Sequence, residues 1–115
     1  MHTWIIESNF TGRWEPCEYC FVSRRDARLS VDSMRKQFPG ETFRVKKYLQ
    51  SGKLRLLRGN GVAWIVEYRV PEVVDWKTAG PCFCRKRDAL GEAKFLRNSY
   101  TSAKYRVSRY IREPW

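Results

Sequence analysis

Four cysteines are the residues whose type and spacing could hold a metal ion. They stand as Cys17-x-x-Cys20 and Cys82-x-Cys84, and four thiolates form a zinc ligand set. The usual signature pairs two C-x-x-C knuckles, and the second pair here departs from it. A redox C-x-x-C is the other chemistry to consider, but the neighbours of Cys17 are acidic, whereas positive surroundings activate a thiol. We therefore expect Cys20 and Cys82 to be reduced, buried thiols, with no metal and no other cofactor.

Catalysis by a nucleophile and a neighbouring base usually requires a histidine as the base, and the sequence offers few. The single histidine is His2, at the start of the sequence, so a Ser-His-Asp or Cys-His arrangement is not expected. Glu7 and Glu67 follow equivalent apolar segments and could serve as an acid and a base. The alternative is that each pairs with an arginine on a neighbouring strand, such as Arg44 or Arg106. We favour the ion pairs and expect no enzymatic activity.

Basic side chains dominate the charge of the sequence and indicate an anionic partner. The chain has 23 Lys and Arg against 12 Asp and Glu, a net charge of +11, which favours a polyanion or an acidic protein surface. Six cations stand where two helices are expected to begin: Arg24, Arg25, Arg28, Arg85, Lys86 and Arg87. Cations there typically cost a helix about 0.3–1 kcal/mol each, and a bound phosphate or carboxylate would explain them. The alternative is a solvated turn in which Asp26 and Asp88 neutralise the charge.

A second basic surface is expected on two strands near residues 43–50 and 105–112. Period-two alternation places apolar residues on one face and cations and tyrosines on the other. The set expected to face outward, joined by one arginine from residues 64–70, is Arg44, Lys46, Tyr48, Arg69, Arg106, Tyr110 and Arg112. Cations interleaved with aromatic rings are typical of surfaces that stack bases and contact phosphates. The alternative is an ordinary sheet face crossed by ion pairs to Glu7 and Glu67.

An internal repeat positions all of these residues. At an offset of 62, ten residues of the segment 14–49 are identical to their counterparts, where ordinary composition gives roughly two or three. Upstream, WIIE at 4–7 matches WIVE at 64–67. The sequence therefore predicts one domain, 1–115, with repeat 1 at about 3–50, a hairpin linker at 51–61 and repeat 2 at about 62–112.

Each repeat is expected to contain a strand, a loop around Trp14 or Trp76 that could include a further short strand, a helix and a final strand. The apolar spacing predicts helices over 24–37 and 86–98. Ser23 fits a helix cap, whereas Arg85 replaces it in repeat 2 and predicts a weaker cap. A Ser-Gly turn and an Asn-Gly turn predict an extra strand at 53–58 in the linker.

These elements predict an α+β fold. Two βαβ, or ββαβ, units would pack two helices on a mainly antiparallel sheet, and tandem βαβ units favour a ferredoxin-like arrangement. In such a sheet the two cysteine pairs would lie at opposite ends, far beyond the reach of a zinc–sulfur bond.

The residues GRWEP (12–16), FVSRRDAR (21–28) and FRVKKY (43–48) resemble small uncharacterised proteins of tailed bacteriophages and prophages. In those proteins a Trp-x-Pro segment, a Ser/Thr-x-x-x-Ala helix start and a Tyr/Phe-Arg-Val strand recur. The match covers most of residues 4–50, and residues 64–112 repeat it with Thr78 in place of the proline. The resemblance implies a phage origin and no particular activity.

Two functions remain in competition. The first is a non-enzymatic protein that binds DNA or RNA with weak sequence preference, because no helix-turn-helix or zinc-finger signature is present. The second is a phage-encoded inhibitor that docks on an acidic surface of a host protein, for host takeover or anti-defence such as anti-CRISPR. No apolar segment approaches ~18 residues, so no membrane partner is expected. We expect a cytoplasmic protein, in the host cytoplasm if it is phage-encoded.

Overall fold

The computed structural model describes residues 2–50 and 61–113, and both repeats fold as strand–strand–helix–strand units. Unit 1 contains β1 (His2–Ser8), β2 (Glu15–Phe21), α1 (Arg24–Gln37) and β3 (Phe43–Gln50). Unit 2 contains β4 (Val62–Arg69), β5 (Lys77–Phe83), α2 (Lys86–Ser99) and β6 (Lys104–Arg112). The strand expected at 53–58, and all of the expected linker except Gly61, lie outside the described residues.

The six strands form one closed antiparallel barrel in the order β1-β2-β5-β4-β6-β3. The expectation of helices packed on an open, ferredoxin-like sheet is therefore wrong. The reason is the second strand of each unit, which the sequence indicates only as a possible short strand in the loop around Trp14 or Trp76. Because β2 and β5 add a third strand to each unit, the free edges of the two units pair with each other and the sheet closes on itself.

Two seams join the units, and they reveal an internal symmetry. At one seam β2 meets β5 through the pair Tyr19↔Pro81, and at the other β3 meets β6 around the pair Leu49↔Ile111. In both pairs the partners are 62 residues apart, which is the repeat offset, so each residue faces its own counterpart. A pseudo-twofold axis therefore passes through both seams and relates the two units.

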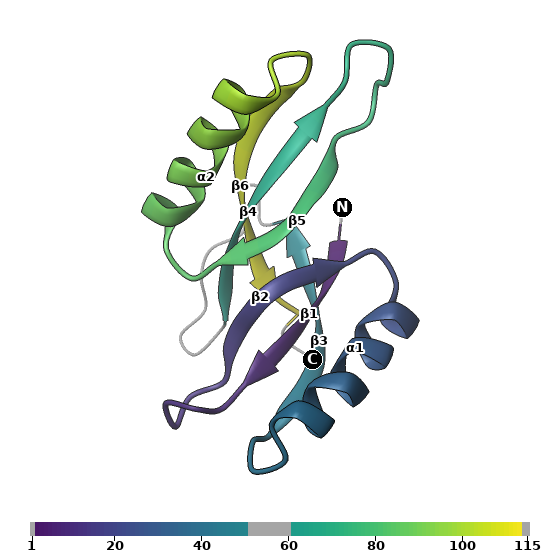
Figure 1. Ribbon diagram of the computed structural model, residues 1–115, viewed down its shortest axis with the longest axis vertical. Coiled ribbons are helices and arrows are strands. Elements are labelled where there is room, and N and C mark those ends of the chain that lie inside the picture. The colour runs from purple at the N-terminus through teal and green to yellow at the C-terminus, as the bar shows by residue number, and fades with distance from the viewer. Residues whose placement is uncertain (1, 51–60, 114–115) are drawn as a thin grey trace.

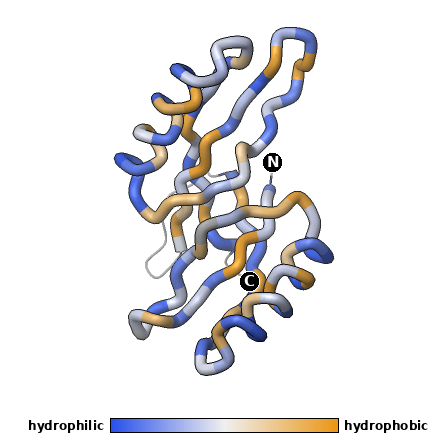
Figure 2. Tube along the Cα trace, viewed as in Figure 1, coloured by the Kyte–Doolittle hydropathy of each residue, from blue (hydrophilic) through white to orange (hydrophobic). Residues whose placement is uncertain are grey.

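The helices cover the outer face of the barrel, one on each unit. Val31 of α1 packs with Ile6 and Phe43, whereas Ala89 and Ala93 of α2 pack with Val66. Both helices begin near the waist of the molecule, where β2 and β5 end, and run toward opposite ends of the long axis (Figure 1). Figure 2 shows hydrophilic residues at both helix starts.

The helix ends match the sequence analysis closely. α1 ends at Gln37, before the Phe-Pro-Gly segment, and the backbone N–H of Asp26 donates to the Ser23 hydroxyl oxygen at 3.1 Å. Arg85 occupies the cap position of α2 without a side-chain cap bond. The predicted weaker cap of the second helix is thus confirmed.

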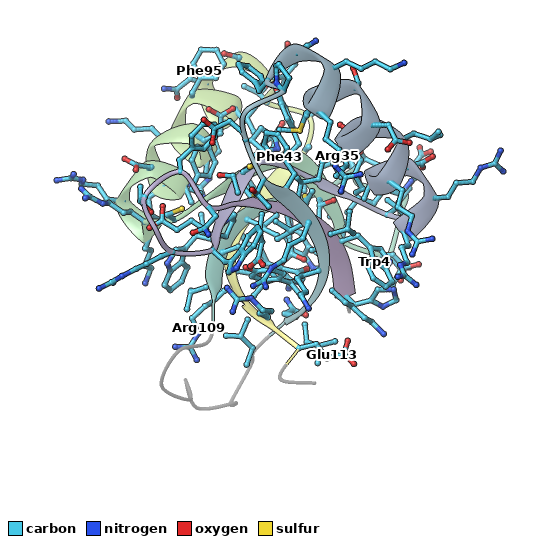
Figure 3. The ribbon with its side chains drawn as sticks, turned by 90° about the horizontal axis from the view of Figure 1, so that it is seen from below. Trp4, Arg35, Phe43, Phe95, Arg109 and Glu113 are labelled. Atoms are coloured by element: carbon cyan, nitrogen blue, oxygen red, sulfur yellow. The ribbon has the colours of Figure 1, made fainter. Side chains whose placement is uncertain are left out.

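The barrel encloses the face of each strand that was expected to point outward. Ile5, Ile65, Tyr48 and Tyr110 share one buried cluster inside it. Side chains fill the space between the strands when the molecule is seen along its long axis (Figure 3). The face of β3 and β6 that carries Tyr48 and Tyr110 therefore turns into the barrel, whereas other strand positions, such as Tyr19 on β2, are exposed.

Candidate functional site

The first polar centre of the interior surrounds the carboxylate of Glu7, whose side chain is 0% exposed. Arg44 Nε donates to Oε1 at 2.7 Å, and both Arg112 Nε at 2.8 Å and the Tyr48 hydroxyl at 2.5 Å donate to Oε2. Gly61 lies against this centre, since a Cβ there would stand 2.5 Å from the Tyr48 hydroxyl and 2.6 Å from Arg112 Nη2. Two guanidinium groups and one phenol therefore hold a single buried carboxylate.

The second centre surrounds Glu67, which is also 0% exposed, and only one cation contacts it among the described residues. Arg106 Nε donates to Oε1 at 2.9 Å and the Tyr110 hydroxyl donates to Oε2 at 2.8 Å. The Ser108 hydroxyl and Gln50 Nε2 also donate to Oε1. Gln50 is the repeat counterpart of Arg112, so each unit sends the same strand position into the carboxylate of the other unit.

Tryptophan rings cover the outer ends of both centres. Arg44 stacks over Trp14 at 4.1 Å and Arg106 over Trp76 at 4.2 Å, measured to the ring centroid. Arg69 also lies over the ring of Trp76, at 5.1 Å from its centroid. These cation–π contacts hold the guanidinium groups in place.

The expectation that Tyr48 and Tyr110 face solvent is wrong, since both are 0% exposed. Burial, followed by the charge of Glu7, raises the pKa of Tyr48 far above its usual range. Burial and the hydrogen bond to Glu67 do the same to the pKa of Tyr110. Neither ring is therefore available to stack on a base, whereas the expected ion pairs of Glu7 with Arg44 and of Glu67 with Arg106 are confirmed.

The other members of the expected sheet surface are also partly covered. Arg44, Arg106 and Arg112 are committed to buried carboxylates, and Lys46 and Arg69 are half-buried. Within residues 2–50 and 61–113 no buried side-chain nitrogen or oxygen lacks a hydrogen-bond partner. The hydrogen-bonding groups of this network are thus satisfied within the chain. The Arg44 and Arg106 side chains remain 30% and 41% exposed, so a binding role for the arginines of this set stays a prediction.

The cations at the helix starts have the opposite surroundings. We call Arg24, Arg25 and Arg28 the α1 cluster, and Arg85, Lys86 and Arg87 the α2 cluster. All six are exposed, and none forms an ion pair in the part of the chain that the structure describes. Asp26 and Asp88 lie in the first turns of α1 and α2 without forming an ion pair with these cations among the described residues. The exposure of the six cations agrees with a solvated turn as well as with a site for an anion.

One cation of each cluster contacts a tryptophan on the neighbouring strand. Arg24 lies 5.7 Å above the ring of Trp4, and its counterpart Lys86 lies 5.6 Å above the ring of Trp64. Both rings are half-buried. The two clusters thus keep the same local geometry in both units, as the pseudo-twofold axis requires.

The cysteines meet at the β2–β5 seam, which corrects the expectation that they lie at opposite ends. Cys20 and Cys82 belong to one buried cluster, and their thiols donate to the carbonyl oxygens of Gly80 and Cys17. Burial raises the pKa of both thiols. Among the described residues no three potential metal ligands form a group that could hold an ion. Their burial confirms the expected packing role.

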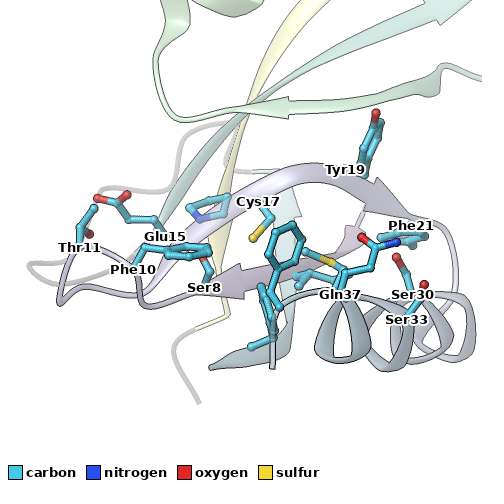
Figure 4. Close-up of a pocket in the computed structure, with 15 residues that line it drawn as sticks. Ser8, Phe10, Thr11, Glu15, Cys17, Tyr19, Phe21, Ser30, Ser33 and Gln37 are labelled. Carbon is cyan, nitrogen blue, oxygen red and sulfur yellow. The ribbon is translucent and has the colours of Figure 1, made fainter. Parts of the chain in front are cut away.

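A cavity that the sequence did not predict lies between α1 and the β1–β2 hairpin. Its volume is about 730 Å³, and most of its lining is apolar, including the exposed rings of Phe10 and Phe38 (Figure 4). Ser30 and Ser33 line it from α1. The repeat places Glu92 and Phe95 at the counterparts of these serines in α2. The two units thus differ in the residues that line this position of the helix.

No described helix combines the length and the hydropathy that crossing a membrane requires. Comparison of the chain with protein-family models, with curated proteins and with solved structures finds no match. The resemblance to phage proteins therefore stays a prediction, and function has to be argued from the geometry of the site.

Proposed function

We propose that this protein binds nucleic acid through the α1 and α2 clusters, with weak sequence preference and without enzymatic activity. The observation that carries the proposal is the contrast between two sets of cations. Interior arginines have buried acidic partners, whereas the six cations of the clusters are exposed and have no ion-pair partner among the described residues. A phosphate backbone supplies the negative charge that such cations lack.

The positions of the clusters in their helices strengthen this proposal. Arg25 and Arg87 lie in the first turns of α1 and α2, where a cation destabilises the helix by about 0.3–1 kcal/mol. The charges of Arg25 and Arg87 therefore do not stabilise the helices in which they lie. Contact with an anion gives them a role, because exposed guanidinium groups form paired hydrogen bonds with phosphate oxygens.

Weak sequence preference follows from the kind of side chain available. The clusters consist of arginine and lysine at the starts of α1 and α2, and the sequence has no helix-turn-helix or zinc-finger signature that would read base edges. Contacts to phosphate position a protein on nucleic acid without reading the sequence. The supporting chemistry for catalysis is absent from the clusters, which contain no nucleophile and no base.

Fluorescence anisotropy with labelled oligonucleotides tests the proposal, titrated at about 50 and 200 mM salt. Six phosphate contacts predict that the logarithm of the affinity falls with the logarithm of the salt concentration with a slope of about −5. Alanine at all six positions should remove most of that slope. The matched control is Lys36→Ala, Lys94→Ala and Lys104→Ala, three exposed cations outside the clusters. An equal loss in the control would reject a specific role for the clusters.

A second candidate function rests on the cavity of unit 1. Its apolar lining and the exposed rings of Phe10 and Phe38 suit an apolar anchor from a protein partner. In that case the chain is an inhibitor that docks on a host protein, and the resemblance to phage proteins favours such a role. Capture from nuclease-treated bacterial lysate, with Phe10→Ala/Phe38→Ala as the comparison, would yield one stoichiometric protein only with the unchanged cavity.

A further inference from the structure

The symmetry of the clusters indicates which form of nucleic acid they fit. The pseudo-twofold axis leaves the molecule at the β2–β5 seam, between Tyr19 and Pro81. From Tyr19 the chain reaches the α1 cluster within five residues, and from Pro81 it reaches the α2 cluster in the same way. The clusters therefore lie on either side of the axis, and β2 and β5 approach them in opposite directions (Figure 1).

A DNA duplex has the matching symmetry. Its two backbones run in opposite directions, and a twofold axis perpendicular to the helix relates them, which is why twofold proteins bind twofold sites. A single strand has one direction and offers no such axis. The clusters share two counterpart pairs, Arg24 with Lys86 and Arg25 with Arg87. In opposite orientations these pairs would meet equivalent phosphates on a duplex and inequivalent ones on a single strand.

The chain between the axis and the clusters limits their separation to about one turn of B-form DNA. Five extended residues span roughly 16 Å, so the two helix starts lie at most about 33 Å apart along β2 and β5. The three dimensions of the molecule are 43, 32 and 25 Å. Equivalent sites on one face of a B-form duplex recur about every 34–36 Å, and the long side chains of both clusters extend the reach of the backbone.

The surface between the clusters is open to a partner. Tyr19, at the axis, is 57% exposed, and Val22, which precedes the α1 cluster, is 83% exposed. Cys84, at the other end of the seam, is exposed as well. A duplex laid across the seam would therefore meet exposed side chains between the clusters.

We infer that the protein binds double-stranded DNA across the β2–β5 seam, with the twofold axis of the duplex on the pseudo-twofold axis of the chain, an inference that rests on the proposed nucleic-acid binding. One cluster contacts each backbone. The binding is then bivalent within one chain, and each unit contributes three cations.

The experiment compares a 20-base-pair DNA duplex, its single strands and the RNA duplex of the same sequence, by anisotropy at several salt concentrations. The expected result is at least tenfold tighter binding to the DNA duplex than to either alternative. Equal or tighter binding to single strands or to duplex RNA would overturn the inference while leaving nucleic-acid binding intact. No binding to any of the three would overturn the proposed function as well.

Variants test the equal share of the two units. Arg24→Ala/Arg25→Ala/Arg28→Ala and Arg85→Ala/Lys86→Ala/Arg87→Ala should each lower the salt slope by about 2 to 3 for the DNA duplex. Loss with only one of these variants would overturn the symmetric arrangement. The Lys36, Lys94 and Lys104 control should keep the slope within about one of the original value.

A single change at the axis provides an independent test. Tyr19→Glu adds a negative charge between the clusters, at an exposed side chain, and should weaken duplex binding at least tenfold. Tyr19→Phe is its control and should bind as the original protein does. Thermal unfolding of each variant separates loss of contact from loss of fold, and a Tyr19→Glu protein that is folded and binds unchanged would contradict the proposed path of the duplex.

Discussion

Arginine has two different roles in this molecule, one inside the barrel and one at the helix starts. Inside, Arg44, Arg106 and Arg112 donate to carboxylates that are 0% exposed. At the helix starts, the arginines of the α1 and α2 clusters are exposed and have no ion-pair partner among the described residues. The difference shows that the net charge of the chain combines cations that pair with buried carboxylates and cations that are exposed to solvent.

The two interior centres also differ from each other. Glu7 receives two guanidinium groups, whereas Glu67 receives one guanidinium together with the neutral side chains of Gln50 and Ser108. Since Arg112 comes from unit 2, the stronger centre is also a charged link between the units. The duplicated barrel has thus kept its geometry while its electrostatics have diverged.

The largest expected effect comes from removing the Glu7 carboxylate. Glu7→Gln leaves Arg44 and Arg112 without their acidic partner, and breaking a buried pair typically costs about 3 kcal/mol or more. Glu67→Gln leaves only Arg106 without its acidic partner. It should therefore lower the free energy of unfolding by at least ~1 kcal/mol less than Glu7→Gln does. Urea unfolding at pH 7 measures both values. Equal losses, or a larger loss at Glu67, would remove the claimed difference between the centres.

A somewhat smaller effect is expected when the two centres are made alike. Arg112→Gln places at Glu7 the residue that its counterpart position carries at Glu67, and loss of a charged hydrogen bond predicts about 2 kcal/mol lower stability. The free energy of unfolding from urea titration checks this value. The reciprocal change, Gln50→Arg, adds a cation at Glu67 and should destabilise less or stabilise.

Alkaline pH should weaken the barrel through its buried phenols. The pKa values of Tyr48 and Tyr110 are raised in the folded protein, so the stability linked to them is fully present below the unfolded value of about 10 and falls as pH rises above it. Urea unfolding from pH 8 to 11 should show a steeper decline for the original protein than for Tyr48→Phe/Tyr110→Phe. Parallel curves would mean that the two phenols titrate alike in both states.

The smallest expected effects lie at the helix starts and carry the opposite sign. Arg85→Ser supplies the cap that Ser23 provides in α1 and should raise the free energy of unfolding by about 1 kcal/mol. The matched control, Ser23→Ala, should lower it by a similar amount. Thermal unfolding resolves both changes. If Arg85→Ser does not raise the stability, the missing side-chain cap does not destabilise α2.

The sequence predicts the units well and their assembly poorly. Helix bounds, the two caps and the Glu–Arg pairs follow from local periodicity and from the repeat, which act within one unit. The closure of the barrel depends on β2 and β5, whose Pro16, Pro81 and Gly80 weaken the strand signal. Without these strands the polar face of β3 and β6 has no cover, and Tyr48 and Tyr110 are assigned to the solvent. The exposed clusters were identified because their position in the helices is unfavourable for folding.

The most direct test of this division of roles is the salt dependence of binding to duplex DNA for two variants. Arg25→Ala/Arg87→Ala removes one exposed cation from each cluster, and Arg112→Gln removes one interior cation. We predict that the first variant lowers the slope by about 2 with unchanged or slightly higher stability, and that the second keeps the slope while losing stability. The reverse pattern, with binding lost through Arg112 and retained without Arg25 and Arg87, would contradict the account.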